Sequence, residues 1–255
     1  MSGSLVVVGT GPGKAELMTP ATAAKIARAT DLVGYGPYLD RVPLMRADQV
    51  RHASDNGVEL ERARHALSLA AAGKQVVVVS GGDPGVFAMA AAVFEAVEAG
   101  DPAWRDLDIR VEPGVTAMLA AAAEVGAPLG GDFCAISLSD NLRAWTTIER
   151  RLKAAADADF VIALYNPASK ARPNQLRKAF DLLRAAKAPD TPVLFVRAAG
   201  TAEAATTTTD LAGADTGRAD MRTLVIIGAS TTRLVHRDGR APWVYTPRSE
   251  KEPRS

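Results

Sequence analysis

The chain of 255 residues contains a single cysteine, Cys134, which lies in an apolar stretch. One cysteine forms no internal disulfide, and an apolar setting favours a small buried side chain over a reactive thiol. A chain of this length buries about 75% of its unfolded surface on folding, so its core needs neither a disulfide nor a structural metal. The sequence therefore predicts an ordinary globular protein.

The net charge is also small, and the apolar runs are short. The formal net charge is +1 at pH 7, whereas general nucleic-acid binders are clearly basic, so we expect no nucleic-acid partner. No apolar run approaches the ~20 residues of a membrane-spanning helix. The short run at 5–8 follows no basic lead of the kind found in signal peptides. We therefore expect a cytoplasmic, soluble protein with no membrane partner.

Strand and helix patterns alternate through the first half of the chain. Continuous apolar runs such as LVVV (5–8) and QVVVVS (75–80) are typical of parallel strands covered on both faces. Thr19-Pro20 supplies an N-cap hydroxyl and a first-turn proline, and Gly73 is placed to end a later helix. The predicted strands are 5–8, 31–36, 75–80 and 107–113, and the predicted helices begin at Pro20 and cover 57–73 and 85–100.

The second half contains more strand and predicts a mixed sheet. Its predicted strands are 133–139, 160–166, 193–198, 203–209 and 223–228, and its predicted helices are 116–126, 145–158 and 174–187. The fold class is therefore α/β, with a parallel-sheet domain over residues 1–113 and a mixed-sheet domain over 114–245. The end of the chain, PRSEKEPRS, has no apolar residue, so residues 246–255 are predicted to be a disordered tail.

The glycine-rich stretch after the first strand, GTGPGK (9–14), resembles a nucleotide-binding loop but departs from both common patterns. The dinucleotide fingerprint G-x-G-x-x-G needs a glycine where this chain has Lys14, and Pro12 removes a backbone donor from the loop. The phosphate loop of NTPases needs Ser or Thr where this chain has Ala15. A nucleotide-binding or nicotinamide-dependent protein is thus an alternative of a different class, and these departures disfavour it.

Three other polar loops follow predicted strands. They are SGGDPGVF (80–87), EPGVTA (112–117) and YNPAS (165–169). Ligands of open α/β sheets bind at the carboxyl ends of the strands, so the three loops suggest one cleft. Each loop taken singly is also compatible with a plain turn, in which Asp83 would act as a helix N-cap.

The order GTGPG, SGGDP, EPGVTA, ALYNPAS and AAGTAEAATTTT resembles the tetrapyrrole (corrin-type) S-adenosylmethionine methyltransferase family over about residues 4–245. The resemblance implies two α/β domains with the active-site cleft between them. It also implies S-adenosylmethionine as cofactor, bound mostly through backbone groups. Carried onto this chain, the implied cofactor-binding residues are Pro12, Gly81, Gly82, Asp83, Val86, Thr116, Ala117, Tyr165, Asn166 and Gly200.

Within the family, GYGPYLD (34–40) and GAPLGGDFCAISLSDNLRAW (126–145) are most similar to members that act on precorrin-3B. The resemblance implies methylation of C17 coupled to ring contraction, which gives precorrin-4. Alternatives within the family are the cobalt-containing substrate of the anaerobic route and another corrin position. A polycarboxylate substrate favours basic residues at the cleft rim, and the loops concerned carry Lys14, Arg41, Arg143, Lys170 and Arg172.

The sequence does not identify the catalytic base. Similar proteins usually carry a histidine where this chain has Gly131, and the candidates to replace it are Tyr38, Asp40, His52 and Asp132. The histidines His52, His65 and His236 lack ligand spacing with any Cys or carboxylate cluster, so no metal site is expected. The resemblance also implies a homodimer.

Overall fold

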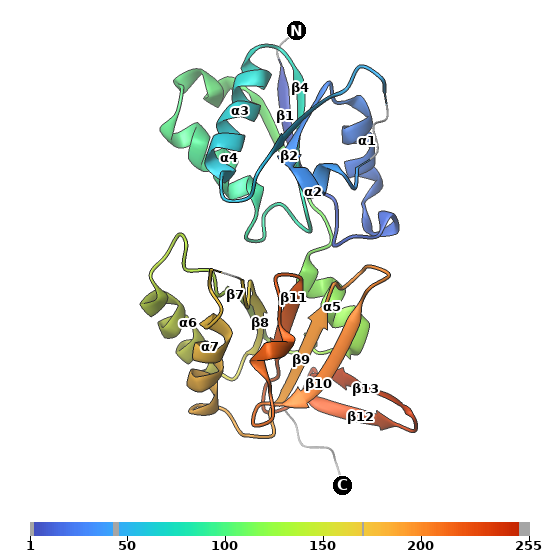
Figure 1. The fold of residues 1–255 in the computed structure, drawn as a ribbon, viewed down its shortest axis with the longest axis vertical. Coiled ribbons are helices and arrows are strands. Elements are labelled where there is room, and N and C mark those ends of the chain that lie inside the picture. Colours follow the sequence, from blue (N-terminus) through green and yellow to red (C-terminus); the bar gives the residue numbers. More distant parts are fainter. Residues whose placement is uncertain (1–2, 43–45, 170, 250–255) are drawn as a thin grey trace. The chain divides into compact units, whose positions relative to one another are not determined.

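The computed structural model describes residues 3–42, 46–169 and 171–249. The chain forms two compact units, which divide between Ala117 and Met118 (Figure 1). The boundary predicted at residues 112–115 lies just before this division. Each unit has its own sheet and its own apolar core, in agreement with the predicted α/β class.

The first unit is built on a five-stranded sheet with the order β3-β2-β4-β1-β5. Its strands are β1 (Ser4–Gly9), β2 (Asp31–Tyr35), β3 (Val50–Ser54), β4 (Gln75–Ser80) and β5 (Asp108–Glu112). Its helices are α1 (Pro20–Arg28), α2 (Gly36–Leu39), α3 (Glu59–Ala71) and α4 (Met89–Ala99). All neighbouring strands are parallel, so their carboxyl ends lie at one edge of the sheet.

The continuous apolar runs of this sheet are buried on both faces, as predicted. Leu5 and Val7 of β1 belong to a core cluster that includes residues of α3 and α4. Val6 and Val8 of the same strand belong to a second cluster, which includes Ile26 of α1. Because side chains alternate along a strand, a run of four apolar residues fills both cores at once.

The helix signals read from the sequence are also confirmed. The Thr19 hydroxyl oxygen accepts a hydrogen bond from the N–H of Thr22 at 3.1 Å, which caps α1. Gly73 follows the end of α3 with φ +86°, a conformation that L side chains rarely adopt.

One expectation for this unit was wrong, and one strand was missed. The helix predicted at 85–100 begins only at Met89, because Phe87 has φ +53° and the stretch before it forms a loop. Strand β3 was not predicted. Its sequence, VRHAS, lacks a continuous apolar run because β3 is an edge strand with half-buried and exposed residues.

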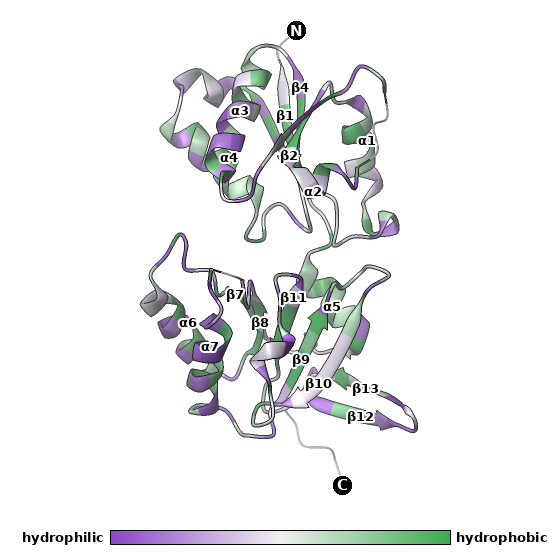
Figure 2. Ribbon diagram, viewed as in Figure 1, coloured by the Kyte–Doolittle hydropathy of each residue, from purple (hydrophilic) through white to green (hydrophobic). Residues whose placement is uncertain are grey.

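The second unit has a five-stranded mixed sheet with the order β10-β9-β11-β8-β7. Its strands are β7 (Phe133–Ser137), β8 (Val161–Tyr165), β9 (Pro192–Arg197), β10 (Ala205–Asp210) and β11 (Thr223–Ile227), and its helices are α5 (Ala117–Val125), α6 (Trp145–Asp157) and α7 (Gln175–Arg184). Within this sheet β7 and β8 pair in parallel, whereas β11 is antiparallel to both β8 and β9. Figure 2 shows the hydrophobic residues concentrated on β8, β9 and β11.

A small three-stranded sheet completes this unit and was not predicted. It consists of β6 (Gly126–Ala127), β12 (Arg233–Arg237) and β13 (Arg240–Tyr245). Thr246, which we assigned to the disordered tail, is buried, and its hydroxyl donates to the carbonyl of Pro128 at 2.6 Å. The tail prediction was therefore wrong at its first residue, and 250–255 lie outside the described residues. Among the helices of the described ranges, none is long and apolar enough to cross a membrane.

Candidate functional site

The loops that follow β1 and β4 pair with each other. The N–H of Gly11 donates to the carbonyl of Gly82 at 3.2 Å, and the N–H of Gly82 donates to the carbonyl of Gly11 at 2.9 Å. Both glycines have positive φ, +75° and +65°. Each of these two N–H donors is therefore bonded to a carbonyl of the facing loop and is not available to a phosphate, which disfavours the nucleotide-loop interpretation of GTGPG.

A third loop, after β5, closes on the same point. A Cβ added to Gly114 would lie 2.3 Å from the carbonyl oxygen of Gly82 and 2.8 Å from the carbonyl oxygen of Gly9. A Cβ on Gly9 would likewise lie 2.6 Å from the oxygen of Gly82. The three strand-end loops therefore meet backbone to backbone, at distances that only glycine allows.

The carboxylate of Asp83 connects two of these loops. Its Oδ1 accepts from the N–H of Gly85 at 2.8 Å, and its Oδ2 accepts from the N–H of Gly114 at 3.0 Å. Asp83 is not the N-cap of α4, because that position belongs to Ala88, which makes no capping bond. The alternative of a simple helix cap is therefore wrong, and Asp83 ties the SGGDP loop to the EPG turn.

Most of the predicted cofactor-binding residues of this unit lie around these loops. A Cβ on Gly82 would be 3.8 Å from the nitrogen of Ala117 and 3.9 Å from the Cα of Thr116, so the two loops are in contact there. Val86 donates its N–H to the carbonyl of Asp83 at 3.3 Å. Pro12, which is half-buried, directly follows the bridging Gly11.

Tyr38 packs directly on Gly81. A Cβ on Gly81 would lie 2.7 Å from the Cζ atom of the Tyr38 ring, so the ring covers the backbone of this predicted cofactor-binding residue. The ring also makes an edge contact with Tyr35 at a centroid distance of 5.4 Å, and the Arg41 guanidinium lies 5.8 Å from its centroid. Of the four candidates for the catalytic base, Tyr38 is therefore placed beside the predicted cofactor loop.

A buried arginine near this point was not predicted. Arg62 of α3 donates its Nε–H to the Ser54 hydroxyl at 2.7 Å and a terminal N–H to the carbonyl of Asp55 at 2.5 Å. Burial lowers the pKa of Arg62, although Glu59 and the phenols of Tyr35 and Tyr38 act in the opposite direction. A core-facing position of an amphipathic helix is usually apolar. An arginine on the same buried face as Ala63 and Ala66 was therefore the sequence signal that could have pointed to this residue.

In the second unit, Tyr165 and Asn166 end β8. The Tyr165 hydroxyl accepts from the N–H of Met118 at 3.0 Å, which fixes the first turn of α5. Asn166 has φ +52° and donates its side-chain N–H to the buried Ser137 hydroxyl at 2.9 Å. A non-glycine residue held at positive φ often marks a functional site.

Gly200 lies in the loop that follows β9. Its N–H donates to the Glu124 carboxylate at 3.2 Å, and its φ is +71°. Strands β8 and β9 are both antiparallel to β11, so their carboxyl ends lie at the same edge of the sheet. Helix α5 therefore contacts both predicted binding loops of this unit, through Met118 and through Glu124.

The other candidates for the catalytic base lie elsewhere. Asp40 is exposed at the C-terminus of α2, and His52 is bonded to Asp31 within the sheet. Gly131 and Asp132 precede β7, which is parallel to β8, so they lie at the opposite edge of the sheet from Asn166. A Cβ on Gly131 would lie 3.0 Å from the Thr246 methyl group. Within this unit, position 131 is thus remote from the predicted binding loops.

The structure describes four of the five basic residues expected at the rim. Lys14 is exposed, Arg143 is half-buried, and Arg172 donates to the side chain of Asn141. Lys170 lies outside the described residues. That these basic residues bind the carboxylates of the substrate stays a prediction.

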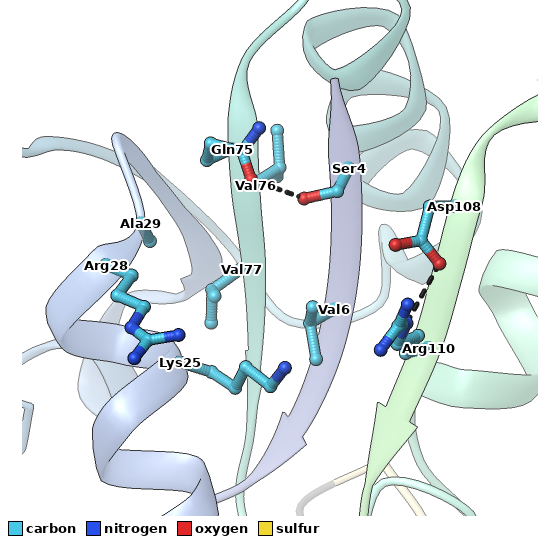
Figure 3. A pocket seen from close by; sticks show the side chains of 10 residues that line it. All are labelled: Ser4, Val6, Lys25, Arg28, Ala29, Gln75, Val76, Val77, Asp108 and Arg110. Carbon is cyan, nitrogen blue, oxygen red and sulfur yellow. Dashed lines mark hydrogen bonds and ion pairs between the residues drawn. The ribbon is translucent and has the colours of Figure 1, made fainter. Parts of the chain in front are cut away.

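A surface pocket of about 210 Å³ lies away from the loops (Figure 3). It extends between α1 and the amino halves of the central strands, and its lining includes Lys25, Arg28 and Arg110. Two of these cations have acidic partners, because Arg110 bonds Asp108 at 2.9 Å and Lys25 lies 3.9 Å from Glu112. The pocket holds none of the predicted site residues.

Comparison with known proteins identifies the family. The family of Tetrapyrrole (Corrin/Porphyrin) Methylases matches residues 4–215. The chain belongs to this family. It is 60% identical over 248 residues to a precorrin-3B C(17)-methyltransferase of Sinorhizobium sp, with 97% of each protein covered. It is 42% identical over 228 residues to a probable cobalt-factor III C(17)-methyltransferase of Salmonella typhimurium, covering 89% of this chain and 93% of that protein.

Among solved structures, the structure of this chain resembles the crystal structure of the methyltransferase CobJ. The TM-score is 0.90 at 52% identity, and the match covers 96% of this chain and 100% of that chain. The resemblance stated from the motifs is therefore confirmed, as are the α/β fold class and the assignment as a methyltransferase. The roles of individual site residues and the cleft between the domains stay predictions.

Proposed function

We propose that this enzyme transfers the methyl group of S-adenosylmethionine to C17 of precorrin-3B in aerobic cobalamin synthesis, with ring contraction to precorrin-4. The observation that carries the proposal is the 60% identity to a precorrin-3B C(17)-methyltransferase over 97% of both chains. The cofactor of the family is S-adenosylmethionine, and nothing in the resemblance links this chain to a nucleic acid or a membrane.

The glycine loops suit such a cofactor. S-Adenosylmethionine carries no phosphate, so its site needs shaped backbone and acceptors for adenine and a sulfonium cation instead of a cradle of N–H donors. Gly9, Gly82 and Gly114 leave no room for side chains where the loops meet, and the Asp83 carboxylate holds them together. We infer that Pro12, Gly81, Gly82, Asp83, Val86, Thr116, Ala117, Tyr165, Asn166 and Gly200 form the cofactor site, as the resemblance implies.

The protein's contribution to methyl transfer is alignment. When bound, the cofactor supplies an electrophilic methyl group, and the tetrapyrrole supplies the nucleophilic carbon. Loops that are locked by backbone bonds, such as the Gly11–Gly82 pair, hold one reactant in place while the second binds. Such positioning contributes up to about 7–11 kcal/mol in well-oriented reactions. The Tyr38 ring, packed on Gly81, would bound the cofactor loop on its β2 side.

A second candidate is the cobalt-containing substrate of the anaerobic route. The 42% identity to a probable cobalt-factor III C(17)-methyltransferase supports this substrate, although at lower similarity than for precorrin-3B. Both candidates require the same fold and cofactor, so only the substrate separates them.

The deciding experiment is incubation of the purified enzyme with methyl-labelled S-adenosylmethionine and either precorrin-3B or cobalt-factor III. We expect a gain of one labelled methyl group by mass spectrometry with precorrin-3B, and carbon NMR should place it at C17. Methylation of the cobalt substrate alone would support the second candidate instead. Binding of NAD or ATP with no binding of S-adenosylhomocysteine in calorimetry would contradict both.

We also infer, from the resemblance alone, that the enzyme is a cytoplasmic homodimer. Light scattering should then give twice the 26.7 kDa of one chain.

A further inference from the structure

His52 and His65 lie side by side, although the sequence shows no metal-ligand spacing. His52 belongs to β3 and His65 to α3. The Nε2 atom of His65 is 3.1 Å from the Nδ1 atom of His52, and the ring centroids are 4.9 Å apart at an interplanar angle of 59°. The fold therefore brings together two of the three histidines that we had set aside as ligands.

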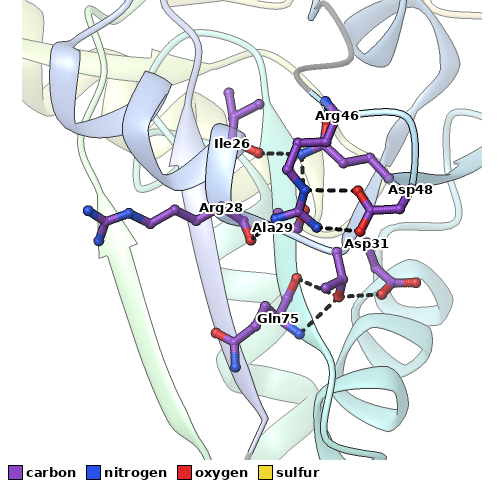
Figure 4. A network of polar contacts seen from close by, with 9 residues as sticks. Ile26, Arg28, Ala29, Asp31, Arg46, Asp48 and Gln75 are labelled. Carbon is purple, nitrogen blue, oxygen red and sulfur yellow. Dashed lines mark hydrogen bonds and ion pairs between the residues drawn. The ribbon is translucent and has the colours of Figure 1, made fainter.

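A buried carboxylate fixes the orientation of one ring. Oδ1 of Asp31 lies 2.8 Å from the Nε2 atom of His52, and the Asp31 side chain is only 5% exposed. Its Oδ2 accepts from the Thr30 hydroxyl at 2.7 Å, and that hydroxyl also contacts the backbone of Gln75 (Figure 4). A carboxylate only accepts, so His52 carries its proton on Nε2 and directs the Nδ1 lone pair at His65.

The Asp31 carboxylate therefore orients His52 in the way that carboxylates orient metal-bound histidines.

The separation of the two nitrogens fits a shared ion. Metal–imidazole bonds of about 2.0–2.1 Å at angles of 90–109° place the two nitrogens about 2.8–3.4 Å apart, and the observed distance is 3.1 Å. A straight N–H···N hydrogen bond at this separation would put the centroids about 5.4 Å apart, which is more than the observed 4.9 Å. The axes that run from each ring centroid through its nitrogen are therefore inclined to the N···N line, as they would be in two ligands of one ion.

We propose that Nδ1 of His52 and Nε2 of His65 chelate one divalent transition-metal ion, with Asp31 as the carboxylate that positions His52. Among the described residues no group of three His, Cys, Asp or Glu side chains could hold a metal, so water completes the coordination. His65 is exposed and the His52 side chain is 23% exposed, so the ion enters from solvent. Imidazole suits copper, nickel and zinc, and Cu²⁺ is the tightest of the three.

The site is separate from the methyl-transfer loops of this unit. It connects the edge strand β3 to α3, whereas those loops follow β1, β4 and β5. A bound ion would therefore stabilise the edge of the sheet, and the thermal midpoint of the folded protein would rise with metal concentration.

The test is calorimetric titration of metal-free, tag-free protein with CuCl₂, NiCl₂ and ZnCl₂. We expect one site per chain, and affinity for Cu²⁺ above that for Ni²⁺ and Zn²⁺. His52→Gln and His65→Gln should each weaken Cu²⁺ binding at least tenfold, and the electron paramagnetic resonance spectrum of bound Cu²⁺ should lose its two-nitrogen coupling. His236→Gln is the matched control, because His236 is exposed on β12 and distant in sequence from the pair.

Asp31→Asn tests the positioning role. It keeps both imidazoles but removes the ionised acceptor, so Cu²⁺ affinity should fall by about tenfold or more, while one ion still binds. Circular dichroism of each variant shows whether the fold is retained, and His65→Gln is the safer variant because its side chain is exposed. Equal Cu²⁺ binding by wild type and His65→Gln, loss of binding in His236→Gln, or no binding at 100-fold excess metal would overturn the proposal.

Discussion

At the residue scale, Asp83 has a role that its position in the sequence only partly indicates. Its carboxylate accepts from Gly85 in its own loop and from Gly114 in another. We predict that Asp83→Ala weakens S-adenosylhomocysteine binding at least tenfold. It should also lower the free energy of unfolding by about 1–2 kcal/mol, because two backbone N–H groups lose their acceptor. Calorimetry and thermal unfolding of the same preparation measure both effects.

The matched control is Asp106→Ala, which removes an exposed carboxylate from the same unit. Its binding and stability should equal those of the wild type. If Asp83→Ala destabilises the protein but leaves the affinity for S-adenosylhomocysteine unchanged, Asp83 only shapes the loop and the SGGDP stretch is not part of the cofactor site.

Residue-level contacts between distant segments were the hardest to predict. The SGGDP and EPGVTA loops could be selected from glycine and polar residues at strand ends. The carboxylate link from Asp83 to Gly114 and the packing of Tyr38 on Gly81 depend on which strands are neighbours. That order, with β1 between β4 and β5, is set by packing of whole helices and strands, so no local pattern reveals it.

At the scale of elements, the loops after β1, β4 and β5 act as one unit because glycine backbones touch. We predict that Gly114→Ala disrupts this contact. The new Cβ would lie 2.3 Å from the carbonyl oxygen of Gly82, so the loops must separate. Overpacking of this kind costs about 1–3 kcal/mol, and S-adenosylhomocysteine affinity should fall with it.

Gly36→Ala is the control for this substitution. A Cβ on Gly36 meets nothing within 4 Å, and this glycine begins α2. Its thermal midpoint and its affinity should therefore stay at the wild-type values. Normal affinity in Gly114→Ala would mean that the cofactor does not depend on how closely the three loops approach.

Elements differed in how well the sequence predicted them, for a physical reason. Strands β1, β4, β8 and β11 are buried on both faces, so their apolar runs were recognisable. Strand β3 lies at an edge, and β12 and β13 form a hairpin with many exposed residues, so neither has such a run. The helix predicted from Gly85 begins later because loop contacts of Asp83 compete with helix formation.

At the scale of the whole molecule, each unit presents predicted binding residues at the sheet edge where the carboxyl ends of several strands lie. In the first unit these are the ends of β1, β4 and β5, and in the second they are the ends of β8 and β9. Each unit therefore gathers its predicted binding residues by the same means, at the ends of strands that run in one direction.

The whole molecule should also lose stability in acid, because both units contain aspartates whose pKa is lowered. Burial raises the pKa of Asp31 and of Asp159, but hydrogen bonds outweigh it, from Thr30 and His52 in the first case and from Lys187 and Ser230 in the second. In both, the folded-state pKa lies below the ordinary 3.8, so the unfolded chain binds protons first as the pH falls. The stabilisation is complete well above pH 3.8 and is lost as the pH falls from about 4 through the folded pKa values.

Calorimetric scans between pH 3 and pH 6 measure this loss, and substitutions assign it to a unit. We expect the thermal midpoint of the wild type to fall steeply below about pH 4. Asp159→Asn should lower the midpoint at pH 6 and flatten its fall in acid, because Lys187, whose side chain is 3% exposed, then lacks its ionised partner at every pH. Asp157→Asn, at an exposed position of α6, should retain the wild-type profile.

If the two units unfold in separate transitions, Asp159→Asn should alter only one of them and Asp31→Asn only the other, since the two residues lie on opposite sides of the division at Ala117. Parallel profiles for wild type and both variants would show that other groups cause the loss in acid.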